Sequence, residues 1–132
     1  MILAIQTADA TTHLALYDPS NPTGPKSEIS WESGRQLADQ LLGRIYELMA
    51  DQPEPGRTLS GIVIFSGAGS FTSLRIGHTV ANALADSLSI PIVGAVGDNW
   101  AQQAIEALAS APIGHFALPH YGAEANVTKP KP

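Results

Sequence analysis

The small-residue stretch at residues 67–77 contains the groups best suited to bind an anion. It follows an apolar run at residues 62–65 and leads into a long helical pattern. Unpaired backbone N–H groups at a helix start can hold a phosphate, so Gly67, Gly69 and Ser70 are candidates for a nucleotide-binding loop. The stretch lacks both a Lys-Ser/Thr pair after the second glycine and the G-x-G-x-x-G spacing. The alternative is a tight structural turn, with Ser70 or Thr72 capping the helix.

Other candidates for chemistry are few and scattered. The aspartates fall in different predicted elements, and only Asp9 lies at a strand end. A two-metal site needs several converging carboxylates. The four histidines, at positions 13, 78, 115 and 120, show no H-E-x-x-H spacing, and the absence of cysteine excludes thiol chemistry. No serine has an evident His and Asp partner, although a spatial triad stays open. We therefore predict no catalytic residue, no metal site and no cofactor.

Arg75 is placed unusually, near the start of a predicted helix. A cation there opposes the helix dipole and needs a compensating acceptor. That acceptor is either a carboxylate, on a neighbouring element or across an interface, or a bound anion. We favour a carboxylate inside the chain or across an interface.

The composition indicates one folded domain with little surface charge. The 132 residues are 44% hydrophobic and 14% charged, with a net charge of −5. A surface poor in charge is often covered by a partner, whereas strong nucleic-acid binding needs a basic patch. The apolar start is too short for a secretory core, and no apolar run approaches the ~20 residues needed to span a bilayer. We expect a cytoplasmic protein with neither membrane nor strong nucleic-acid contact.

The pattern of apolar residues predicts an α/β fold with a mixed five-stranded sheet in the order β-β-β-α-β-α-β-α. Ser33 and Asp98 are the expected caps of the first and third helices. Residues 1–110 form the predicted lobe, and residues 111–132 an extended C-terminal tail. The strands are predicted at residues 2–5, 12–17, 28–31, 62–65 and 91–96, and the helices at 34–50, 72–88 and 99–108.

The first two helices are richer in apolar or small residues than covering a sheet requires. The first has a row of large apolar residues widened by Leu42 and Met49, and the second has a narrow strip of small residues four apart. We hypothesise that part of this surplus meets equivalent helices of a partner. The residues expected at that interface are Leu41, Ile45, Leu48, Ser73, Gly77 and Ala81.

Two motifs resemble those of the TsaB (YeaZ) family. Residues 1–8, MILAIQTA, are similar to the family's opening I-L-A-I-D-T-A, and residues 67–77, GAGSFTSLRIG, to G-P-G-S-F-T-G-L-R-I-G. The closing residues 119–121 and 127–130 are also similar. The sequence departs from the family at Gln6, Ala68 and Ser73, where the family has Asp, Pro and Gly. It also lacks most of the family's second lobe, so we expect a shortened form in which that lobe is naturally deleted.

The resemblance implies one actin-like, ribonuclease-H-like lobe of the ASKHA type. It implies a non-catalytic partner of the enzyme TsaD in making threonylcarbamoyladenosine on tRNA, with TsaE as a further partner. The family pairs through its first two helices, with TsaD or, when alone, with a second copy. The alternatives are a small nucleotide-binding or phosphotransfer module using residues 67–70, and a stand-alone dimer with another partner.

Overall fold

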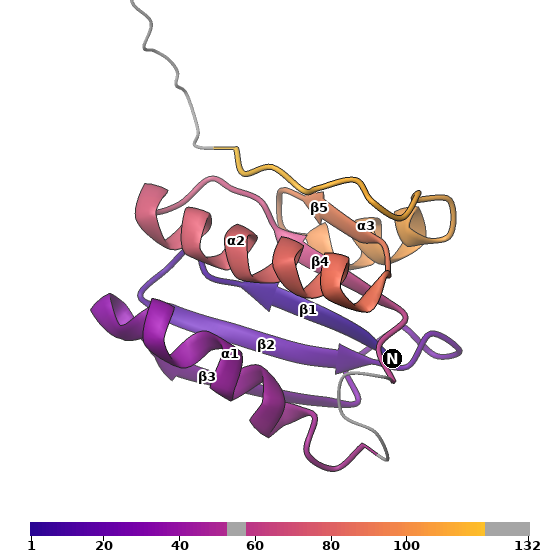
Figure 1. Ribbon diagram of the computed structural model, residues 1–132, viewed down its shortest axis with the longest axis horizontal. Helices are drawn as coiled ribbons and strands as arrows, with labels where there is room; N and C mark the ends of the chain where they lie inside the picture. Colours follow the sequence, from indigo (N-terminus) through magenta and orange to yellow (C-terminus); the bar gives the residue numbers. More distant parts are fainter. Residues whose placement is uncertain (53–57, 121–132) are drawn as a thin grey trace, which may run out of the picture.

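The computed structural model describes residues 1–52 and 58–120. They form a five-stranded sheet in the order β3-β2-β1-β4-β5 (Figure 1). β1 pairs antiparallel with β2, and β2 with β3, whereas β4 is parallel to both β1 and β5. Short loops can join antiparallel neighbours, but parallel strands need crossover helices. The predicted mixed sheet is confirmed, with strands at Ile2–Gln6, Thr11–Tyr17, Ser27–Glu32, Gly61–Phe65 and Ile92–Ala95.

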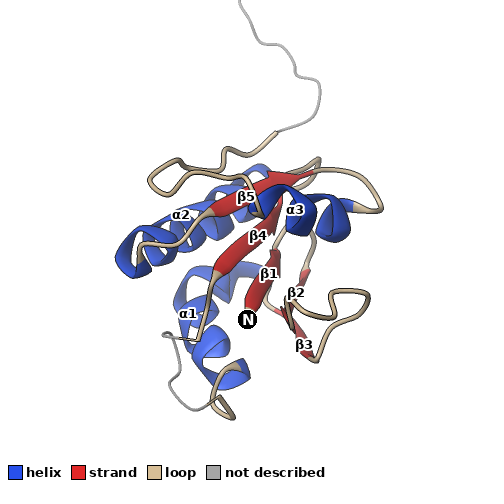
Figure 2. Cartoon of the chain, turned by 90° about the vertical axis from the view of Figure 1, so that its right-hand side faces the viewer, coloured by secondary structure: helices blue, strands red, loops and turns tan. Residues whose placement is uncertain are grey.

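Helices cover both faces of the sheet. α1 (Leu37–Leu48) and α2 (Phe71–Leu88) lie side by side on one face, and α3 (Trp100–Leu108) lies on the other (Figures 1 and 2). Alternate residues of β1 point to opposite faces, as strand geometry requires. Leu3 and Ile5 therefore pack in the core under α1 and α2, and Ile2 and Ala4 in the core under α3.

Two of the predicted helix caps are wrong. The first helix starts with a 3₁₀ turn at Gly34–Gln36, and Ser33 makes no cap hydrogen bond there. Its hydroxyl instead bonds to the Thr12 hydroxyl at 2.7 Å. The third helix is preceded by Asn99 rather than Asp98, again without a side-chain cap. Ser70 is confirmed as the cap of α2, since its Oγ accepts a 3.3 Å hydrogen bond from the Ser73 N–H.

The chain after α3 runs in extended form beside α2 and β5 (Figures 1 and 2). Asn82 of α2 holds it with two hydrogen bonds of 2.9 Å, one to the Ala117 carbonyl and one from the Ala117 N–H. The His120 N–H donates to the Ser66 carbonyl. Residues 121–132 of the predicted tail lie outside the described residues, so the domain boundary at residue 110 stays a prediction. Within the described parts of the chain, no helix is long and apolar enough to cross a bilayer.

Candidate partner-binding face of helices α1 and α2

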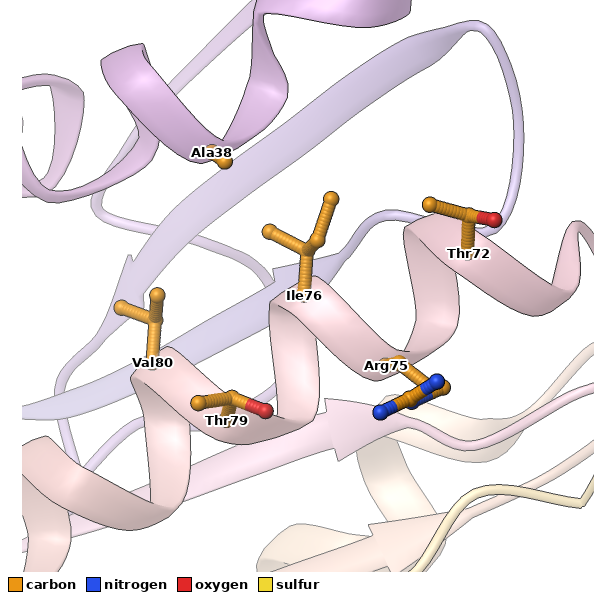
Figure 3. A pocket seen from close by; sticks show the side chains of 6 residues that line it. All are labelled: Ala38, Thr72, Arg75, Ile76, Thr79 and Val80. Atoms are coloured by element: carbon orange, nitrogen blue, oxygen red, sulfur yellow. The ribbon is translucent and has the colours of Figure 1, made fainter.

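A shallow groove runs between α1 and α2 on the side that faces away from the sheet. Its volume is about 290 Å³. Ala38 of α1 lines one side, and Thr72, Ile76 and Val80 of α2 point toward it from the other (Figure 3). These three residues are four apart and therefore share one side of the helix. The groove can accept an apolar side chain from outside.

Two larger apolar side chains continue this surface along α1. Leu42 is 46% exposed and Tyr46 is 49% exposed, and they follow Ala38 at intervals of four. Ile76 and Val80 are only partly buried against the core. We call this surface the α1–α2 face, and its members are Ala38, Leu42, Tyr46, Thr72, Ile76, Thr79 and Val80.

The structure revises the sequence-based choice of interface residues. Five of the six face the sheet and are buried within the chain, namely Leu41, Ile45, Leu48, Gly77 and Ala81.

The sixth residue, Ser73, is half-buried, and its carbonyl accepts a 2.8 Å hydrogen bond from the Thr7 hydroxyl. A Cβ at Gly77 would clash with the same Thr7 side chain. The small-residue strip thus lets α2 approach the end of β1, and the residues free to meet a partner belong to the neighbouring rows.

The loop before α2 is filled by residues of the same chain. A Cβ on Gly69 would clash with Ala8, and a Cβ on Gly67 would clash with the backbone of His120. The Ser70 N–H donates to the Ala8 carbonyl at 3.0 Å. Gly67 also has a φ of 135°, which favours glycine. These contacts support the tight-turn interpretation of residues 67–70.

The structure brings together one polar pair that lies twelve residues apart in the sequence. Ser66, at the end of β4, lies 2.9 Å from Nε2 of His78 on α2, and both residues are buried. Nδ1 of His78 is 2.8 Å from the Leu74 carbonyl, which can only accept, so Nδ1 carries the proton and Nε2 accepts from the Ser66 hydroxyl.

Burial lowers the pKa of His78, outweighing the Leu74 hydrogen bond, which raises it. None of the described carboxylates bonds to His78, and the pair joins β4 to α2. Elsewhere in the described residues, no three His, Asp or Glu side chains gather closely enough to hold a metal.

Comparison with known proteins assigns the chain to a family. The sequence model described as "TsaD: tRNA N6-adenosine threonylcarbamoyltransferase" matches residues 31–96, half of the 132 residues. The "tRNA threonylcarbamoyladenosine biosynthesis protein TsaB" of Bacillus subtilis (strain 168) is 34% identical over 91 residues, which are 69% of this chain and 38% of that protein.

Solved structures show the same fold. YeaZ from Pseudomonas aeruginosa superimposes with a TM-score of 0.63 at 24% identity, over 72% of this chain and 43% of that one. A second Pseudomonas aeruginosa structure, titled as an uncharacterized protein with similarity to peptidase YeaZ, gives 0.64 at 24% identity, over 72% and 42%.

These likenesses define an α/β lobe with a mixed five-stranded sheet, the fold of the YeaZ structures. The chain belongs to the family of that TsaD model and to the TsaB (YeaZ) proteins. It spans about two fifths of the length of the relatives it matches.

Proposed function

We propose that this protein is a non-catalytic partner subunit in the synthesis of threonylcarbamoyladenosine on tRNA, and that it binds TsaD through the α1–α2 face. The observation that carries the proposal is the exposed apolar groove between the two helices, in a chain of the TsaB family. Two helices side by side can pack with two helices of a partner as a four-helix bundle.

The energetics of the α1–α2 face favour a partner. Leu42 and Tyr46 each leave nearly half of their surface in water, beside a groove whose walls are largely apolar. Burying apolar surface stabilises a complex by roughly 25 cal/mol per Å² before the costs of association. Removing even a few hundred Å² of this face from water would therefore contribute several kcal/mol by the same estimate.

The assignment of catalysis to the partner rests on how the reactive groups of this chain are placed. The matching sequence model is described as a transferase, whereas the Bacillus subtilis relative is described as a biosynthesis protein. Ser66 and His78 bond to each other at 2.9 Å, but both are buried and none of the described carboxylates bonds to His78, so the pair lacks the third member of a catalytic triad. The exposed face that remains is suited to binding rather than to bond making.

The same face accounts for the expected homodimer. Without TsaD, a second copy of this chain would cover the apolar groove, and a homodimer results. TsaE is retained as a further partner from the family resemblance alone. We propose that the protein acts in the cytoplasm, where tRNA is modified.

The proposed contact is tested by placing a charge on the α1–α2 face. Leu42→Asp changes a side chain that is 46% exposed, so the variant should fold. A carboxylate desolvated against the partner should weaken binding to TsaD of the same organism by roughly 100-fold, equivalent to about 2.7 kcal/mol. Calorimetric titration of purified TsaD with each variant measures the effect.

The matched control is Ala107→Asp, which adds the same charge to an exposed position of α3, on the other face of the sheet. It should bind as the wild type does. Equal binding by Leu42→Asp would refute the proposed contact. Micromolar binding of Mg-ATP by the isolated chain would instead favour the nucleotide-binding alternative at residues 67–70.

A further inference from the structure

Arg75 stands on the ridge that borders the α1–α2 face. It lines the groove with Ile76, but Figure 3 shows its side chain leaving α2 on the side away from Ala38. The same residue lines a second hollow of about 210 Å³, between α2 and the extended segment at Ala117. Arg75 therefore lies where a molecule docked in the groove would meet the outer edge of α2.

Within the described part of the chain, Arg75 has no carboxylate partner. Its guanidinium lies over the ring of Phe71, 5.5 Å from the ring centre. Arg44 on α1 is the contrast: it also lies over an aromatic ring, that of Trp31 at 4.9 Å, but it pairs with Glu47 at 3.3 Å. That pair is the one ion pair among the described residues.

Arg75 is exposed and solvated by water, and its position and chemistry favour an anionic acceptor. A cation near the start of a helix is opposed by the helix dipole. Of the two carboxylate acceptors that the sequence allows, one inside the chain is not found among the described residues. The planar guanidinium, resting on Phe71, presents a fork of N–H donors that matches a carboxylate. The other acceptor, a carboxylate across an interface, is one that a partner docked in the adjacent groove could bring to Arg75.

We propose that Arg75 forms an ion pair with a carboxylate on the partner's docked helix. The partner surface is thus an amphipathic helix whose apolar side chains enter the groove and whose Asp or Glu reaches Arg75. This inference rests on the proposed function, because it assumes that the α1–α2 face is the docking surface. The adjacent apolar groove fits a protein helix better than a phosphodiester chain, and the net charge of −5 disfavours a polyanion.

The experiment compares Arg75 variants in binding to TsaD of the same organism at low and moderate salt. Arg75→Gln should weaken binding about 10-fold, as expected for a charge-assisted contact at an interface edge, and should flatten the dependence of Kd on salt. Arg75→Glu should weaken it further, and Arg75→Lys should give an intermediate loss because the charge stays while the fork is lost. Arg44→Gln is the matched control and should bind normally, since Arg44 is already paired.

The possible outcomes separate this inference from the proposed function. If Arg75→Gln binds with the wild-type Kd and salt dependence while Leu42→Asp does not bind, the ion pair is refuted and the docking face stands. If the wild type does not bind TsaD, or Leu42→Asp binds it normally, the proposed function fails and the ion pair with it. If the isolated chain binds inorganic phosphate and Arg75→Gln abolishes that binding, Arg75 serves an anion and the inference is overturned. Thermal melting of each variant, with Arg75→Lys as the mildest change, verifies that it is folded.

Discussion

Helix α2 carries two rows of residues at the same spacing, and they serve opposite purposes. Gly77, Ala81 and Ala85 are four apart and buried against the sheet. Thr72, Ile76 and Val80 are also four apart and line the open groove. A row of small residues shows that something approaches the helix closely. Here that neighbour is Thr7 of the same chain.

Helix α1 repeats this contrast with larger side chains. Its buried row, Leu37, Leu41, Ile45 and Leu48, covers the sheet, and its exposed row is Ala38, Leu42 and Tyr46. In both helices the row richest in apolar or small residues stabilises the monomer. The sparser row beside it is exposed, and it is where the proposed partner would bind.

The sharpest test of this contrast uses two adjacent leucines. Leu41→Asp places a carboxylate at a site with no exposure, so it should destabilise the chain by more than about 4 kcal/mol. Leu42→Asp should shift the free energy of unfolding by less than about 1 kcal/mol, as exposed substitutions do. Urea unfolding followed by circular dichroism measures both. Similar losses of stability would mean that the two rows are not distinct.

A second comparison uses two glycines, one in each helix. Gly77→Val forces a branched side chain into Thr7, and overpacking of this kind should cost about 3 kcal/mol and roughly 10 °C in Tm. Gly43→Val in α1 has open space around it and should change stability by less than ~0.5 kcal/mol. Calorimetric melting of Gly77→Val and Gly43→Val measures the two changes in Tm. A folded Gly77→Val chain of normal Tm that only loses partner binding would restore the small-residue strip as an interface.

The smallest effect concerns His78, on the side of α2 that faces β4 and the C-terminal segment. Because burial lowers the pKa of His78, the unfolded chain takes up a proton more readily than the folded one. Its contribution to stability is therefore full above about pH 6.5, the ordinary histidine value, and is lost as the pH falls toward the lower folded pKa.

Unfolding measured between pH 7.5 and pH 5 should show this loss in the wild type and a weaker one in His78→Gln. The groups that face His78 are the Ser66 hydroxyl, the Leu74 carbonyl and His120, whose charge also lowers the pKa of His78. His13 and His115 are present in both proteins and are not among the groups that shift the pKa of His78, so their contribution cancels. If His78→Gln lost stability with falling pH as steeply as the wild type, the loss could not be assigned to His78.

Local patterns predicted much of the fold, because local physics sets them. The apolar runs of β1 and β4 and the alternation in β2 locate the sheet, and the Ser70 cap is correct because it bonds within its own turn. Ser33 was predicted wrongly because its hydroxyl bonds to Thr12, on a strand twenty-one residues away. The Ser66–His78 pair had no local signal, since it forms only where α2 crosses the end of β4.

The candidate site likewise depends partly on local patterns and partly on contacts between distant residues. The sequence alone determines that α1 and α2 each carry more than one apolar or small row, and that Arg75 lies near a helix start without an adjacent carboxylate. Only the tertiary structure decides which row turns toward the sheet and which toward solvent. Adjacent rows of a helix differ by a rotation of about 100°. That rotation is set by how well each row packs against distant strands, which no local spacing records.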